Sequence, residues 1–277
     1  MWLVVAGIAS VQLGAGIAKS VFDDAAPLTL VWLRLATSAV VLVVLVRPTL
    51  RDRTPADWRV AVAFGVVLGT MNAAIYESFA RIPLGIAVTI EFLGPLGLAV
   101  AGSRRARDLV WVALAATGVG LLGIERGDLT VAGVAFALVA ASSWTAYILL
   151  SASTGRRWPG LDGLTVASVV ATVMMVPLLA AFSGRGISDP RVVVLGALVG
   201  LLSSVIPYSC EITALRTIRP SVFGILMSLE PAAAALAGIV VVHEFLSALQ
   251  WLAVACVIAA SVGATRTESR IAAPAPD

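Results

Sequence analysis

Residues 85–91 are Gly85-Ile-Ala-Val-Thr-Ile-Glu91, and residues 224–230 are Gly224-Ile-Leu-Met-Ser-Leu-Glu230. The two stretches lie 139 residues apart in a chain of 277, so each half of the chain carries one copy. In each copy a glutamate lies in the middle of an otherwise apolar segment. An ionised carboxylate is costly inside an apolar membrane helix, so its recurrence in register indicates a functional use and an internal repeat.

The composition places this chain in a membrane. Hydrophobic residues make up 60% of the sequence, charged residues make up 13%, and the mean hydropathy is +1.00. A soluble protein of this size could not bury so much apolar surface. We therefore expect an all-α polytopic membrane protein in contact with lipid. The net charge of +3 comes with no basic arm that carries interleaved aromatic residues, so no nucleic-acid partner is expected.

Apolar segments long enough to cross a bilayer recur along the whole chain. A spanning helix needs roughly 20 mostly apolar residues, and turn residues and charges mark the breaks between spans. Ten segments are predicted to span the membrane, at about 2–18, 28–46, 60–79, 83–101, 109–124, 131–151, 164–182, 192–212, 222–242 and 246–264.

The basic residues predict how these spans are oriented. With a cytoplasmic N-terminus, thirteen of them fall in inner loops and the tail and five fall in outer loops, which favours both termini inside. The inner residues are Arg47, Arg51, Arg53, Arg59, Arg104, Arg105, Arg107, Arg156, Arg157, Arg216, Arg219, Arg266 and Arg270. The outer residues are Lys19, Arg81, Arg126, Arg185 and Arg191.

Ten spans in two halves give five spans per half. Because five is odd, the second half enters the membrane the other way up, and the halves are predicted to be inverted repeats, as in many secondary transporters. Tyr76 and Glu77 at the end of the third span are matched by Tyr208 and Glu211 at the end of the eighth. The predicted units are a first repeat at 1–127, a second repeat at 128–264 and a disordered cytoplasmic tail at 265–277.

Glu91 and Glu230 fall near the middle of the fourth and ninth predicted spans. Each is expected to face a cavity or a partner, and each can change its protonation state as a binding site opens and closes. They are the predicted residues for substrate binding or proton coupling. The alternative is a protonated glutamate that hydrogen-bonds to a neighbouring helix. Pro95 and Pro231 follow them closely and are predicted to kink their helices, because proline removes a backbone donor.

Arg34 lies well inside the second predicted span, where its permanent charge needs compensation. It either pairs with an intramembrane glutamate or holds a substrate carboxylate, and we place it with the substrate or coupling residues. The remaining polar or amphipathic residues at membrane depth are candidates to line a cavity. They are Gln12, Asn72, Tyr76, Glu77, Trp144, Tyr147, Tyr208 and Glu211. A position in the membrane interface is the competing interpretation for the tyrosines and for the two helix-end glutamates.

The sequence contains no pattern typical of an enzyme or a metalloprotein. His243 is the only histidine, and Cys210 and Cys256 fall inside predicted spans, so neither a zinc site nor a disulfide framework is expected. There is no nucleotide-binding loop and no Ser/His/Asp arrangement. We therefore predict no catalytic residue, no cofactor and no bound metal.

The two glutamate segments also resemble known transporter motifs. The segment from Pro83 to Leu96, with Glu91 and Pro95, and the segment from Phe223 to Ala232, with Glu230-Pro231, are similar to the paired motifs of EamA-type transporters in the drug/metabolite transporter superfamily. Three further stretches resemble the bacterial threonine/homoserine exporter group within it. They are Pro207-Tyr208-Ser-Cys-Glu211, the Ser103-Arg104-Arg105 loop, and Glu244 through Ala259-Ala260-Ser261.

This resemblance implies ten helices in a five-plus-five inverted repeat around a central cavity, in the bacterial inner membrane. It implies secondary export of a small-molecule substrate, an amino acid such as threonine or homoserine, by proton antiport with alternating access. A drug, an organic cation or a nucleotide precursor is the alternative substrate. An intramembrane enzyme acting on a lipid headgroup is a remote alternative, since its catalytic groups would cluster at one membrane face whereas the polar residues here lie at mid-depth in both halves.

Overall fold

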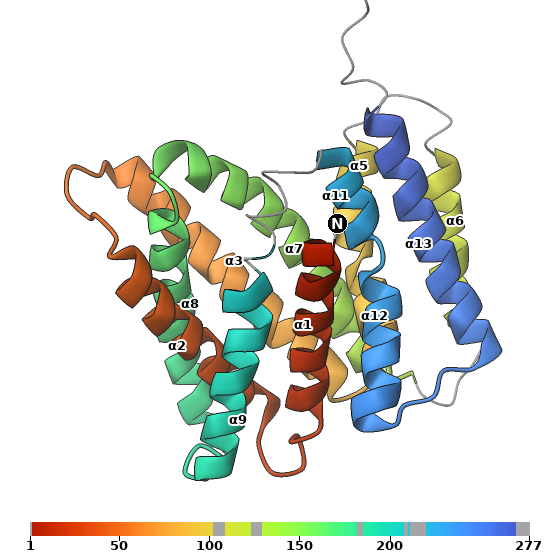
Figure 1. Cartoon of the computed structure of the whole chain (residues 1–277), viewed down its shortest axis with the longest axis horizontal. Helices are drawn as coiled ribbons and strands as arrows, with labels where there is room; N and C mark the ends of the chain where they lie inside the picture. The colour runs from red at the N-terminus through yellow and green to blue at the C-terminus, as the bar shows by residue number, and fades with distance from the viewer. Residues whose placement is uncertain are drawn as a thin grey trace, which may run out of the picture.

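The computed structural model describes residues 2–101, 109–122, 129–181, 185–207, 210 and 220–269. These residues form helices that run back and forth between two ends of the molecule (Figure 1). In chain order the helices are α1 (Trp2–Lys19), α2 (Pro27–Val46), α3 (Pro55–Phe79), α4 (Leu84–Glu91), α5 (Leu93–Ala101), α6 (Leu109–Leu122), α7 (Val131–Arg157), α8 (Asp162–Ala181), α9 (Pro190–Gly200), the π-helical turn η2 (Leu201–Val205), α11 (Pro220–Met227), α12 (Glu230–Ala237), the π-helical turn η3 (Gly238–Val242) and α13 (Ala248–Ser269).

Every predicted span contains a helix within the described residues. Seven helical stretches are long and apolar enough to cross a membrane. Three apolar stretches are shorter, namely Leu84–Leu98, Leu109–Leu122 and Pro190–Val205. The helical content confirms the predicted all-α class, and the seven long apolar helices agree with a polytopic membrane chain.

Helix boundaries differ from the prediction in several places, and α7, which was expected to end near residue 151, continues to Arg157. The third span was expected to start near residue 60, but α3 starts at Pro55 because Thr54 and Asp57 form a capping box, in which each side chain accepts the other's backbone N–H. At the other end of the chain, α13 continues to Ser269, so the first five residues of the predicted disordered tail are helical. Arg266 in its last turn complements the helix dipole. Residues 270–277 lie outside the described residues.

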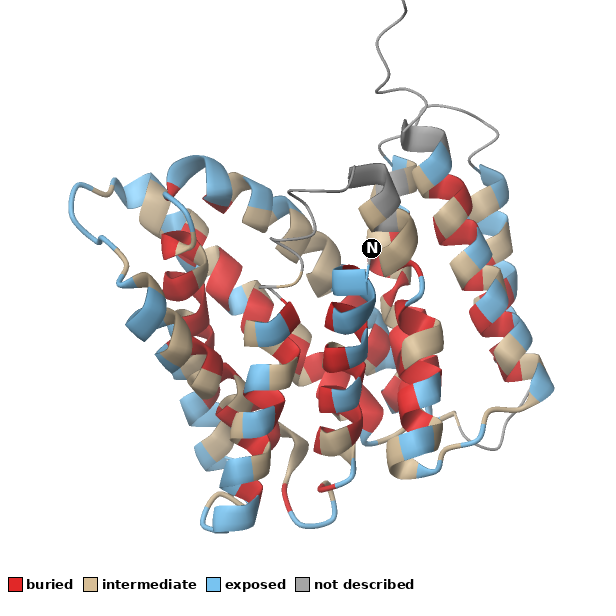
Figure 2. Ribbon diagram, viewed as in Figure 1, coloured by how far each residue is buried: buried red, intermediate tan, exposed pale blue. Residues whose placement is uncertain are grey.

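The helices pack around a central group made of α1, α4, α7 and α12. Helix α3 packs on α7 and α8, α2 packs on α8 and α9, and α1 packs on α12, α9 and η2. Helices α6 and α13 form a pair at one edge of the molecule (Figure 1). Buried residues face the inside of this bundle, whereas apolar side chains such as Val44 and Val173 are exposed on its outer faces (Figure 2). An apolar outer surface is expected where lipid replaces water.

One close helix contact that bears on the repeat is between α4 and α12. A Cβ atom added to Gly85 would lie 2.7 Å from the Cα atom of Ala235, which is closer than packed atoms allow. Small residues let membrane helices approach in this way, because packing rather than the hydrophobic effect holds them together. The helices that carry the two glutamates are therefore in direct contact.

Candidate functional site

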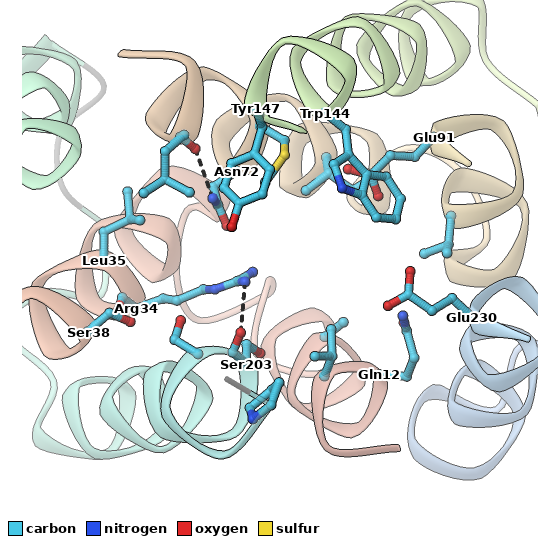
Figure 3. A pocket seen from close by; sticks show the side chains of 18 of the residues that line it. Gln12, Arg34, Leu35, Ser38, Asn72, Glu91, Trp144, Tyr147, Ser203 and Glu230 are labelled. Carbon is cyan, nitrogen blue, oxygen red and sulfur yellow. Dashed lines mark hydrogen bonds between the residues drawn. The ribbon is translucent and has the colours of Figure 1, made fainter. Parts of the chain in front are cut away.

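A cavity of about 230 Å³ lies between helices from both halves of the chain. Its lining comes from α1, α2, α3, α4, α7, α8, η2, α11, α12 and Pro207. Arg34 extends into the cavity from one wall, and Glu91 and Glu230 lie on the opposite wall (Figure 3). The cavity therefore holds fixed groups that can carry charges of both signs.

Both glutamates lie at breaks in their helices. Glu91 is the last residue of α4, and Glu230 is the first residue of α12. The preceding helix α11 ends at Met227. Pro95 and Pro231 lack the N–H that would bond to the carbonyl four residues earlier, which is that of Glu91 and of Met227. Glu91 and Met227 are also the last residues of α4 and α11. Each helix therefore ends at the residue whose carbonyl group would have bonded to the N–H that proline lacks. Glu91 is partly exposed toward the cavity, and Glu230 is buried.

Arg34 is held by neutral groups. Its Nη2 donates to the carbonyl oxygen of Ser203 at 3.3 Å, and its Nη1 lies 3.5 Å from the hydroxyl oxygen of Tyr76, whose ring centre is 5.7 Å from the guanidinium carbon. The ion pairs among the described residues do not include Arg34, so the expected pair with Glu91 or Glu230 is not formed in this structure. Its Nε atom is buried without a partner. The guanidinium is therefore available for a carboxylate from a bound molecule.

Four of the other sequence candidates line the same cavity: Gln12, Asn72, Trp144 and Tyr147. Asn72 donates from Nδ2 to the carbonyl of Leu68 in its own helix at 2.8 Å. Trp144 packs edge-on against Phe92, with ring centres 5.5 Å apart. Gln12 is buried, and its Oε1 atom has no hydrogen-bond partner. These residues surround the charged groups with polar and aromatic surface.

The remaining candidates lie elsewhere or cannot be placed. Tyr76 is fully buried and reaches the site only through its contact with Arg34. Glu77 forms an ion pair with Arg81, one turn later in the chain, and is not among the described residues that line the cavity. Tyr208 and Glu211 lie outside the described residues.

Sequence reasoning missed four serines in the cavity wall. They are Ser38, Ser168, Ser203 and Ser204. Serine is frequent in membrane helices because it is small enough for close packing, so its presence in a span carries no signal of its own. Only the packing of the helices shows which serines face the cavity.

A partly buried ion pair at one end of the molecule is a further contact that no sequence pattern predicted. Lys19, the last residue of α1, pairs with Glu244 in the connection between η3 and α13. Lys19 Nζ also donates to the carbonyl of Ile82 at 2.8 Å, and Glu244 Oε2 accepts the backbone N–H of Leu84 at 2.9 Å. These contacts join three separate connections at the end of the molecule that we call the Lys19 end.

A second set of contacts crosses between the halves at the Lys19 end. Arg185, before α9, donates from Nη2 to the carbonyl of Phe22 at 2.9 Å. Its own carbonyl accepts the backbone N–H of Ala26 at 3.1 Å and the hydroxyl of Thr29 at 3.0 Å. The connections that follow α1 and α8 are thereby held together.

Comparisons with known proteins agree with a transporter. The sequence profile of the EamA-like transporter family matches residues 131–266. Threonine/homoserine exporter RhtA of Escherichia coli (strain K12) is 38% identical over 276 residues, covering 97% of this chain and 93% of that protein. Threonine/homoserine exporter RhtA of Salmonella typhimurium (strain SL1344) is 38% identical over 267 residues, covering 95% and 90%.

Two further similarities are more distant. Uncharacterized transporter YwfM of Bacillus subtilis (strain 168) is 29% identical over 156 residues, which is 55% of this chain and 53% of that protein. A protein of known crystal structure superposes with a TM-score of 0.67 at 18% sequence identity, over 98% of this chain and 99% of that chain. The second similarity shows that the whole chain shares its fold with a solved protein.

Proposed function

The chain belongs to the EamA-like transporter family, and from this premise we propose that it exports a small amino acid from the bacterial cytoplasm across the inner membrane. Threonine and homoserine are the substrates to test first, because the nearly full-length relatives are named as exporters of these two compounds. Both amino acids are zwitterions with a hydroxyl group on a short side chain.

The observation that carries this proposal is the separation of charged groups in the cavity. Arg34 lies on one wall and the two glutamates lie on the other (Figure 3). A zwitterion would place its carboxylate at the guanidinium and its ammonium group toward Glu91 and Glu230. The arrangement suits an amino acid better than a purely anionic or purely cationic substrate, because such a substrate would leave one wall uncompensated.

We further propose that residues 1–127 and 128–264 are inverted five-helix repeats. In this scheme α1, α2, α3, α4–α5 and α6 correspond in order to α7, α8, α9–η2, α11–α12 and α13. The packing supports it, because α3 contacts α7 and α8 just as its counterpart α9–η2 contacts α1 and α2. Likewise α4 contacts α7, and its counterpart α12 contacts α1. In the pairs α4–α12 and α6–α13, each helix contacts its own counterpart in the other repeat.

Alternating access follows from this plan. Rocking of one repeat against the other would expose the cavity first to one side of the membrane and then to the other. With both termini cytoplasmic, as the basic residues favour, the Lys19 end faces outward. The contacts of Lys19 and Arg185 across the halves would then keep the outer side closed, and the structure would represent an inward-facing state.

In a proton antiport mechanism, the two glutamates would be the groups that bind the transported proton. A proton entering from outside would compete with the substrate ammonium group for Glu91 and Glu230, so that substrate release and proton uptake are linked. Glutamine in place of either glutamate mimics the protonated form and should uncouple transport from the proton gradient.

The test uses purified protein in vesicles loaded with radiolabelled threonine or homoserine under an imposed pH gradient. We expect the wild type to release substrate faster with the gradient than without it, and Glu91→Gln and Glu230→Gln to lose this acceleration. Glu77→Gln is the matched control, because Glu77 lies outside the described cavity lining and pairs with Arg81. Unchanged acceleration in both cavity variants would remove the glutamates from the mechanism, and a wild type that moves neither amino acid would overturn the substrate class.

A further inference from the structure

Two connections at the end of the molecule opposite the Lys19 end are rich in arginine (Figure 1). Residues 47–59 run from the end of α2 into α3, and residues 156–162 run from the end of α7 into α8. These two stretches contain six arginines and three aspartates, so their net charge of +3 equals that of the whole chain. The arginines, which we call the arginine surface, are Arg47, Arg51, Arg53, Arg59, Arg156 and Arg157.

Hydrogen bonds hold the two connections side by side. Arg53 Nη1 donates to the carbonyl of Arg157 at 3.4 Å, and Arg157 Nη1 pairs with Asp57 Oδ1 at 3.3 Å. The Asp162 carboxylate accepts the backbone N–H of Thr49 at 3.0 Å and the hydroxyl of Thr49 at 2.8 Å. The backbone segments that carry the arginines are therefore held in a fixed relation to each other.

The same contacts leave positive charge on the outside of this end. Asp57 and Asp162 are occupied by the internal hydrogen bonds, and of the three aspartates only Asp52 is exposed. Four of the arginines are exposed and take part in no ion pair among the described residues, namely Arg47, Arg51, Arg59 and Arg156. Like charges on one surface repel one another, and an anionic partner would relieve this repulsion.

Apolar side chains accompany the arginine surface and indicate the kind of anion that it fits. Leu50, between Arg47 and Arg51 in the chain, is 50% exposed, and Val44 and Leu45 are exposed in the last turn of α2. In a chain whose apolar helices cross the membrane, this helix end lies near the lipid headgroups. A phospholipid offers a phosphate for the arginines and acyl chains for the apolar side chains, whereas a free phosphate ion or a nucleic acid backbone offers only the charge.

We propose that the arginine surface binds the headgroup of an anionic phospholipid in the leaflet that it faces. Arg53 is the best-ordered member, because its guanidinium carbon lies 4.8 Å from the Trp158 ring centre and its Nε donates to the carbonyl of Thr49 at 3.3 Å. Its Nη2 group makes no hydrogen bond with the described residues, and a guanidinium group can donate to a phosphate through two N–H groups. This binding does not depend on which molecule the central cavity carries.

The test measures lipid binding to the purified full-length protein in detergent. Native mass spectrometry gives the apparent dissociation constants of phosphatidylglycerol and of phosphatidylcholine with the same acyl chains, at one fixed ionic strength. The wild type should bind phosphatidylglycerol more tightly. Because a basic residue near a lipid surface contributes about 1 kcal/mol, Arg51→Gln and Arg156→Gln should each weaken phosphatidylglycerol binding about fivefold and leave phosphatidylcholine binding unchanged.

Arg191→Gln is the matched control. Arg191 is also exposed, but it lies at the start of α9, two residues after Asp189 and away from the arginine surface. Its phosphatidylglycerol binding should stay within about twofold of the wild type. Arg51→Lys keeps the charge and should lose less binding than Arg51→Gln. The midpoints of thermal unfolding without added lipid should be equal in all four variants, which separates lipid binding from folding.

Three outcomes would overturn the inference. They are a wild type that binds the two lipids equally, an equal loss of phosphatidylglycerol binding in Arg191→Gln and Arg51→Gln, and displacement of phosphatidylglycerol by an equal concentration of inorganic phosphate. The last outcome would assign the arginine surface to a free anion. None of these measurements involves an amino acid, so the proposed export function and this inference stand or fall separately.

Discussion

Lys19 and Glu244 form an ion pair that joins α1 to the connection after η3, across the two halves of the chain. The side chains are only 13% and 23% exposed. Backbone groups complete the pair, since Lys19 also bonds to the carbonyl of Ile82 and Glu244 to the N–H of Leu84. Removing one partner of such a pair leaves a partly buried charge uncompensated, and this costs more than the pair itself contributes. The state that contains the pair is therefore selectively weakened by a single substitution.

The first prediction is that Lys19→Met opens the Lys19 end more often. We place one cysteine at Val88, which lines the cavity, in a background where Cys210 and Cys256 are serine. A membrane-impermeant thiol reagent is then added from outside. If the pair contributes about 1.4 kcal/mol to the closed state, the population open to the outside and the labelling rate both rise about tenfold.

The matched control is Glu77→Gln. It breaks the ion pair with Arg81 within a single stretch of chain and leaves the Arg81 guanidinium over the Phe136 ring of α7. Labelling of the Val88 cysteine should then stay at the wild-type rate. An equal rise in both variants would indicate general loosening of the protein, and no rise in Lys19→Met would contradict an outer gate at this position.

The second prediction concerns the carboxylate end of the substrate. Arg34→Lys keeps the charge but loses the planar set of donors, and Arg34→Met loses both. We expect the KM for threonine export to rise about tenfold in Arg34→Lys and further in Arg34→Met, because a charged hydrogen bond contributes about 1.5–3 kcal/mol. Threoninamide, which lacks the carboxylate, should show no such loss.

Tyr76→Phe provides the control for this prediction. The Tyr76 hydroxyl lies 3.5 Å from Arg34 Nη1, which is long for a hydrogen bond, and the phenylalanine ring can still lie beside the guanidinium. Its KM for threonine should remain within about twofold of the wild type. If both arginine variants exported threonine with unchanged KM, Arg34 would have a structural role only.

Hydropathy was sufficient to locate the helices but not their detailed limits. Each apolar segment identified in the sequence contains a helix, because long apolar runs have few other stable structures in lipid. The early start of α3 depends on the capping residues Thr54 and Asp57, and the late end of α13 follows a run of small and polar residues that hydropathy alone does not count as span. Local hydrogen bonding, and not hydropathy, sets the start of α3.

The site was only partly accessible to sequence reasoning. Glu91, Glu230 and Arg34 were found because charge inside an apolar span is conspicuous. Lys19 and Glu244 were not paired in advance, because each lies at a span end, where an isolated charge is ordinary and its partner lies more than 200 residues away in the sequence. Contacts between distant helix ends depend on tertiary packing, and no local sequence pattern predicts them.

The third prediction tests the contact between the two helices that carry the glutamates. Gly85→Ala would place a methyl group 2.7 Å from the Cα atom of Ala235, so α4 and α12 must separate. Such overpacking destabilises a protein by about 1–3 kcal/mol, and we expect a lower midpoint of thermal unfolding in detergent. Gly120→Ala in α6 is the matched control. Its new methyl group meets nothing within 4 Å, and alanine favours a helix over glycine, so its midpoint should equal or exceed that of the wild type. If both variants unfolded at the wild-type midpoint, α4 and α12 would not pack as closely as this arrangement requires, and the two glutamates would not share one rigid wall.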